Sequence, residues 1–153
     1  MKRFVCIIIA SFMALTLCAC HNDIPKGYVE CEEFFENDAI MDHTDFAMYV
    51  YPSAEVFEKN LKLDLYELTE DDEADIELVK DYISFIEEML ESGDRADEFK
   101  FDYDCIGSGD LVKLNTREGQ KETENSTYGK YDDFDMYFFD KETLTLYFFH
   151  NDN

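Results

Sequence analysis

Two pairs of aspartates have a spacing that could hold a cation. Asp102 with Asp104, and Asp133 with Asp135, are each two residues apart, so both carboxylates of a pair share one face of a strand. If the two strands are neighbours, the four carboxylates could gather around a hard cation such as Ca²⁺. Solvated charges are the simpler interpretation, because the spacing does not supply the six to eight oxygen ligands that Ca²⁺ prefers. We therefore predict neither a metal ion nor a cofactor, and keep the four aspartates as a cation-site hypothesis.

Cysteines and histidines offer a second kind of chemistry. Cys31 and Cys105 are the two cysteines that follow residue 20. They are either joined by a disulfide, worth roughly 4 kcal/mol in an exported protein, or two buried thiols. A thiol nucleophile would need a base within hydrogen-bond reach, and His43 or His150 could serve. No local motif joins these residues, so no catalytic residue is predicted.

The first twenty residues have the character of an export signal. Lys2 and Arg3 precede an uncharged apolar run over residues 4–20. A secretory signal needs this order of a cationic start and a short apolar stretch. The run is at the lower limit for crossing a bilayer core of roughly 30 Å, so a removable signal is favoured over a permanent span.

The end of this run resembles the lipobox of bacterial lipoproteins. Residues 17–20, LCAC, give an aliphatic residue, a tolerant position, a small residue and then cysteine. In that family the cysteine thiol is joined to diacylglycerol, and cleavage leaves the lipidated cysteine as the new N-terminus. The resemblance implies that residues 1–19 are a removed signal peptide and that Cys20 carries the lipid. Cys18 fits poorly, because Leu17 would occupy the position that needs a small residue.

The lipobox also implies the localisation of the protein, which is the outer side of a cell membrane, extracellular or periplasmic. Residues 20–27 would then be the lipidated cysteine and a short tether, and residues 28–153 a single domain. A diacylglyceryl group has two acyl chains, which is enough for stable attachment.

The chain is strongly acidic, with 37 acidic and 13 basic residues and a net charge of −24. Removing Lys2 and Arg3 with the signal changes this to about −26. Such a charge keeps a protein soluble and monomeric, and it discourages nucleic acid as a partner. Disorder is not expected, because 14 Phe and 10 Tyr supply material for a core.

The hydrophobic pattern predicts the elements that must position these residues. Apolar residues at helical spacing, with Gly93 as a stop, predict a helix over 70–92, and Ser53 can cap a second helix. Residues 28–36 could form one or two helical turns, and residues 117–130 are expected to be a loop. Extended segments with alternating or continuous apolar residues predict strands at 45–51, 98–105, 110–116, 133–140 and 144–150.

These elements predict an α+β fold, in which an antiparallel sheet of about five strands packs against two helices. We interpret the protein as a membrane-anchored extracytoplasmic lipoprotein that binds a cationic protein, peptide or solute. Two alternatives stay open: an envelope hydrolase using paired carboxylates, and a structural component of the envelope.

Overall fold

The computed structural model describes residues 23–34, 43–71, 73–116, 131 and 133–152. The predicted signal peptide, Cys20 and the predicted loop over 117–130 lie outside these residues and stay predictions. Within the described part of the chain, no helix is both long and apolar enough to cross a membrane.

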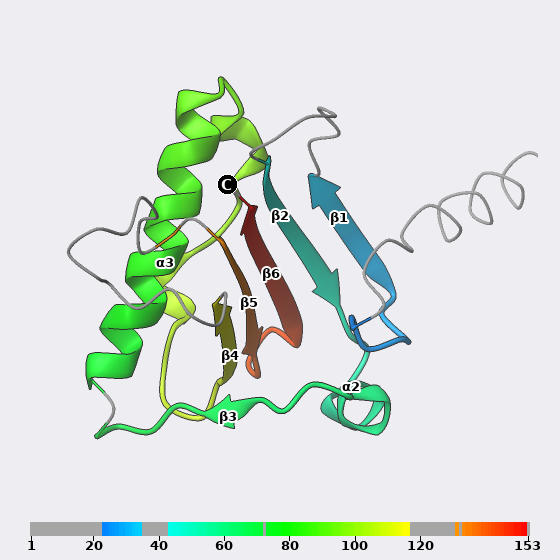
Figure 1. Ribbon diagram of the computed structural model, residues 1–153. Coiled ribbons are helices and arrows are strands. Elements are labelled where there is room, and N and C mark those ends of the chain that lie inside the picture. The colour runs from blue at the N-terminus through cyan, green and yellow to red at the C-terminus, as the bar shows by residue number, and fades with distance from the viewer. Residues whose placement is uncertain (1–22, 35–42, 72, 117–130, 132, 153) are drawn as a thin grey trace, which may run out of the picture.

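The described chain forms one antiparallel sheet of six strands in the order β1-β2-β6-β5-β4-β3 (Figure 1). The predicted α+β class is confirmed, with six strands where about five were expected. The strands are β1 (Glu30–Phe34), β2 (His43–Val50), β3 (Tyr66–Glu67), β4 (Leu111–Thr116), β5 (Asp133–Asp140) and β6 (Thr145–Asp152).

Both predicted helices are present. The shorter, α2 (Ala54–Asn60), begins after Ser53, whose hydroxyl accepts a hydrogen bond from the Val56 backbone N–H at 3.3 Å. The longer is α3 (Glu73–Ser92). It ends at Ser92 as predicted, although Asp94 and not Gly93 adopts the left-handed conformation that follows it, with φ 60°.

Two segments differ from the sequence prediction. Residues 30–34, expected in helical turns, form β1, because the edge of β2 offers them a full set of strand partners. Residues 98–105, expected as a strand, form a connection flanked by the short 3₁₀ helices η1 (Ala96–Glu98) and η2 (Tyr103–Cys105). The aromatic side chains of this connection pack down onto the sheet, as the ring of Phe101 shows at 4.8 Å from that of Tyr147.

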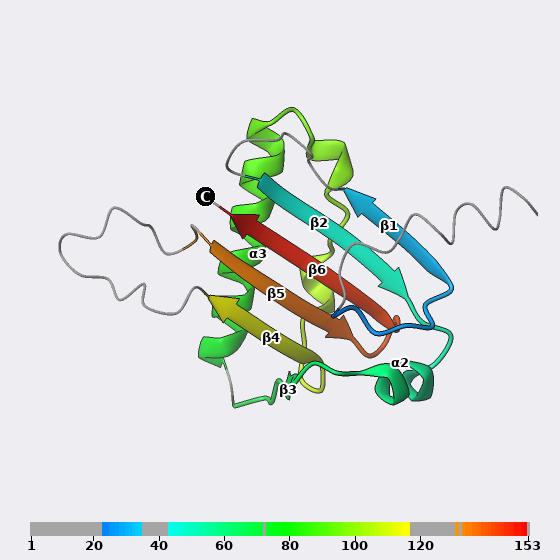
Figure 2. The same cartoon turned by 45° about the vertical axis from the view of Figure 1, so that its right-hand side comes forward.

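The sheet is buried on both faces. α3 lies across one face (Figure 1), where Ile83 and Ile86 pack into a core that includes Phe46 and Phe149. The other face, turned toward the viewer in Figure 2, carries a second core that includes Phe57 of α2. We call the face that α3 covers the α3 face, and the face turned toward the viewer in Figure 2 the open face.

The predicted tether over 20–27 partly belongs to the domain. Ile24 is 8 % exposed and lies in the core of the open face. The Tyr51 hydroxyl donates a hydrogen bond to the Pro25 carbonyl at 2.6 Å. The folded domain therefore begins before residue 28.

Candidate functional site

Six polar side chains form two rows across the central strands at one end of the open face. In the first row His150 of β6 stands between Asp45 of β2 and Asp135 of β5. The second row has Asp152 between its register partners on β2 and β5. Because side chains of a strand alternate between faces, all six share the face of Leu146 and Phe148. The six are His43, Asp45, Asp133, Asp135, His150 and Asp152.

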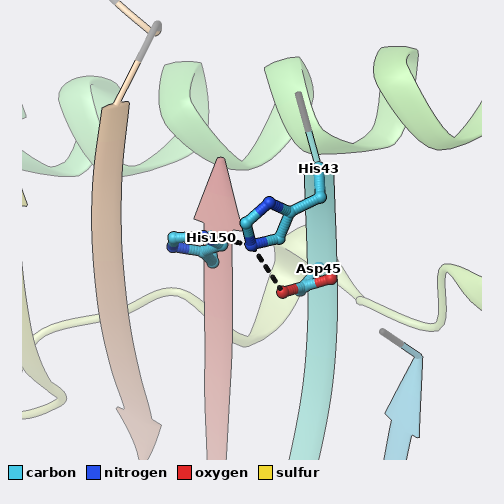
Figure 3. Close-up of side chains that lie close together, drawn as sticks. All are labelled: His43, Asp45 and His150. Carbon is cyan, nitrogen blue, oxygen red and sulfur yellow. Dashed lines mark hydrogen bonds and ion pairs between the residues drawn. The ribbon is translucent and has the colours of Figure 1, made fainter. Parts of the chain in front are cut away.

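Three of these residues approach one another closely (Figure 3). Nε2 of His150 lies 3.0 Å from Nε2 of His43, and the latter atom lies 3.8 Å from Oδ2 of Asp45. The other ring nitrogen of His150, Nδ1, lies 2.8 Å from Oδ1 of Asp135. Each of the three strands thus contributes at least one group to the cluster.

Asp135 determines which nitrogen of His150 is available. An ionised carboxylate can only accept a hydrogen bond, so Nδ1 of His150 carries a proton and donates it to Asp135. In the neutral imidazole, Nε2 then keeps its lone pair. That lone pair faces His43, whose Nε2–H donates to it. His150 is therefore held in the tautomer that a metal ion or a proton donor would need.

The cluster is buried at one side and open at the other. Asp45 is 4 % exposed, whereas the side chains of His43 and Asp135 are 38 % and 40 % exposed. Burial opposes the charged form of His150, but its hydrogen bond to Asp135 and the surrounding carboxylates outweigh burial. The pKa of His150 consequently lies above its ordinary value.

The four predicted aspartates do not form one site. Asp133 and Asp135 lie on the open face. Asp102 and Asp104 belong to the connection that packs on the α3 face, as the contacts of Tyr103 between them show. The Asp102 side chain accepts the backbone N–H of Asp104 at 3.0 Å and so caps η2. The hypothesis that these four acids meet on neighbouring strands is wrong, because 98–105 is not a strand.

The two cysteines do not pair with each other. Cys105 has a free thiol, so the hypothesis of a Cys31–Cys105 bridge is wrong. Burial raises the pKa of the Cys105 thiol to about 12, and nearby carboxylates add to this rise. Cys105 packs on the α3 face, across the sheet from His43 and His150, so neither histidine can act as its base.

Sequence reasoning considered His43 and His150 only as bases for a thiol and did not consider Asp45 as a ligand. One signal was present: His43 lies two residues before Asp45, where the predicted strand 45–51 begins, so a strand that started two residues earlier would put both side chains on one face. The missing information was the strand order, which puts β6 between β2 and β5.

A second feature lies on the outer side of α3. An open hollow of about 540 Å³ is lined by several residues of this helix, including Glu77 and Asp81, and by Tyr103. Glu77 is paired with Lys80 at 3.4 Å, and Asp81 accepts a hydrogen bond from the Tyr131 hydroxyl at 2.7 Å. The hollow is therefore a polar depression on the surface and not an enclosed cavity.

Comparison with known proteins gives no relative from which a function could be transferred. No protein-family model matches the chain, and neither a curated protein nor a solved structure matches it.

Proposed function

We propose that this protein is a lipoprotein of the cell envelope, held outside the cytoplasm by diacylglycerol on Cys20, and that its acidic domain binds a cationic protein or peptide. The observation that carries the binding proposal is the charge on the outer side of α3. This helix contains seven acidic residues and a single lysine, and that lysine already contacts Glu77.

The position of these charges suits recognition of a cation. The acids at 73, 77, 81, 88 and 91 are exposed, so they add to the long-range field of a chain with a net charge of −24. A field of this kind accelerates the encounter with an oppositely charged partner. The hollow beside Glu77 and Asp81 gives a basic side chain a place to dock.

The chemistry of Cys105 supports binding over catalysis by this thiol. Cys105 is a free thiol with a pKa of about 12, so almost none of it is thiolate near neutral pH. Asp102 and Asp104 are not on a strand and lie on the other face of the sheet, so the alternative of an envelope hydrolase with paired carboxylates keeps only the pair Asp133 and Asp135.

Binding is tested with a decalysine peptide as the probe. The double variant Glu77→Gln, Asp81→Asn should bind the peptide several-fold more weakly than wild type. A matched variant, Glu55→Gln with Glu58→Gln, removes two exposed acids from α2 and should change affinity much less. Equal losses in the two variants, or no binding at low salt, would contradict the assignment to α3.

Salt dependence separates steering from docking. The association rate of the peptide should fall as the Debye length shrinks from roughly 30 Å at 0.01 M salt to about 8 Å at 0.15 M. If the association rate is insensitive to salt, the acidic field has no role in recognition.

The anchor is tested independently. Cys20→Ala should leave an unprocessed precursor, whereas Cys18→Ala should be processed normally. The intact mass of the wild-type protein should show cleavage before Cys20 and an added lipid; cleavage elsewhere with no lipid would refute the anchor.

A further inference from the structure

We propose that His43, Asp45 and His150 bind a divalent transition-metal ion of the Zn²⁺ class, and that Asp135 orients His150 for this role. The site goes beyond the proposed binding of a cationic partner and does not depend on it. It lies on the open face, across the sheet from α3.

The distances are close to those of a metal centre. Two imidazole nitrogens bound to one tetrahedral Zn²⁺ at 2.0–2.1 Å are about 3.3 Å apart. The Nε2 atoms of His43 and His150 are 3.0 Å apart, so a small separation of the rings would admit the ion. One ligand atom from each of the three residues lies within 4.8 Å of the other two, so modest side-chain rotations suffice to bring all three onto one ion.

The protonation of the two imidazole rings is compatible with metal binding. Nε2 of His150 already presents its lone pair, because Nδ1 donates to Asp135. His43 must move its proton from Nε2 to Nδ1, and its ring is exposed enough to exchange that proton with water. Metal binding then replaces the hydrogen bond between the two rings with two metal–nitrogen bonds.

The ligand set also selects the kind of ion. Two imidazoles and one carboxylate suit Zn²⁺ and its neighbours, whereas Ca²⁺ and Mg²⁺ prefer oxygen ligands. A carboxylate that holds the second nitrogen of a ligating histidine is a recurrent feature of metal centres, and Asp135 occupies this position. Three protein ligands would leave one position for water or for an external donor.

The neighbouring charge favours entry of a cation. Asp133 and Asp152 belong to the second row and add negative charge beside the three ligands. The open side of the cluster, at His43, gives an ion a path from solvent. The buried side, at Asp45, places one carboxylate where competition from water is weak.

The test is calorimetric titration of the full chain in detergent with ZnCl₂. Binding should have a 1:1 stoichiometry, and millimolar Ca²⁺ or Mg²⁺ should not displace Zn²⁺. Co²⁺ bound at the same site should give visible absorption of a four- or five-coordinate ion with nitrogen ligands.

Four variants locate the site. His43→Gln and His150→Gln should each weaken Zn²⁺ binding by at least about 10- to 100-fold, and Asp135→Asn by about 10-fold. His21→Gln, which removes the third histidine of the chain, is the matched control and should bind as wild type does. The side chain of His43 is 38 % exposed at the start of β2, so its substitution should not prevent folding.

Three results would overturn the proposal. They are the absence of saturable 1:1 binding by wild type, binding retained in the variant lacking both His43 and His150, and loss of binding in His21→Gln alone. Far-UV circular dichroism of each variant checks that it is folded. If His150→Gln does not fold, the titration and the Co²⁺ spectrum of His43→Gln decide.

Discussion

Truncation of Ile83 tests the packing of α3 on the sheet. Ile83 is fully buried among the apolar residues of the α3 face. Met89 lies on the same helix and is 37 % exposed. The variants Ile83→Ala and Met89→Ala therefore shorten two large apolar side chains of one helix in opposite environments.

The expected effects differ several-fold. Removing a buried isoleucine side chain down to alanine costs about 2–5 kcal/mol, because transfer energy is lost and a cavity remains. A substitution on an exposed position is usually within about 0.5 kcal/mol of wild type. With an unfolding entropy of about 2.1 cal/mol/K per residue and about 125 residues, 1 kcal/mol corresponds to about 4 °C in the melting midpoint. Ile83→Ala should lower the midpoint by about 8–20 °C, and Met89→Ala by about 2 °C or less.

Thermal denaturation followed by circular dichroism measures both variants, and urea unfolding gives the free energies directly. The urea slope m should be the same in wild type and both variants, because unfolding exposes nearly the same surface area in all three. If Ile83→Ala melts within 2 °C of wild type, or if the melting midpoints of the two variants fall by the same amount, α3 does not pack on the sheet through Ile83.

The remaining predictions concern a cap, a turn, a thiol and the acids near η2. Ser53→Ala should reduce the free energy of unfolding by about 1 kcal/mol in urea titration, because α2 loses its N-cap acceptor. Asp140→Ala should cost about 1–3 kcal/mol in the same assay, since its carboxylate accepts two backbone N–H groups and a hydroxyl in the β5–β6 turn. Peptide mapping at pH 8 should show that Cys105 is alkylated roughly a thousandfold more slowly in the folded chain than in the urea-unfolded chain. The reason is that folding raises the pKa of its thiol from 9.0 to about 12 and so lowers the thiolate fraction. Equal alkylation rates would contradict this. Asp102→Asn with Asp104→Asn should leave any metal-induced rise in the melting midpoint unchanged, and a loss of that rise would return these acids to a metal site.

The elements predicted correctly have strong local signals. α3 has a complete apolar stripe, α2 has a serine cap, and β5 and β6 are rich in aromatic residues around a short turn. For these segments the local pattern and the tertiary packing favour the same structure.

The two failures have one cause, which is that tertiary partners decide the structure of short aromatic segments. Residues 30–34 show helical spacing, yet β2 has a free edge that they pair with over five residues. Residues 98–105 alternate as a strand would, but their aromatic side chains, Phe101 for example, cover the α3 face as an irregular layer. Period-two alternation shows that a segment has one apolar side, and it does not show whether its backbone joins a sheet.

The sequence did not predict the candidate site for a related reason. Strands β2, β5 and β6 carry apolar side chains on both faces, so their sequences do not show which residues of different strands lie opposite one another. The cluster depends on the register that puts His150 opposite both Asp45 and Asp135. A shift of one residue would send His150 to the α3 face and leave no cluster.

The same register explains why a cation would matter to the fold as well as to function. In the second row Asp152 lies directly opposite Asp133, and like charges in such cross-strand pairs are destabilising. In the first row His150 separates two carboxylates, one of them almost fully buried. A divalent ion held by the histidines and Asp45 would add two positive charges where acids are concentrated. An ion that binds only the folded state stabilises it by about 2.7 kcal/mol at a hundred times its dissociation constant, which is about 10 °C in a domain of this size. Metal binding at this end of the sheet would therefore stabilise the fold where carboxylates of neighbouring strands lie opposite one another.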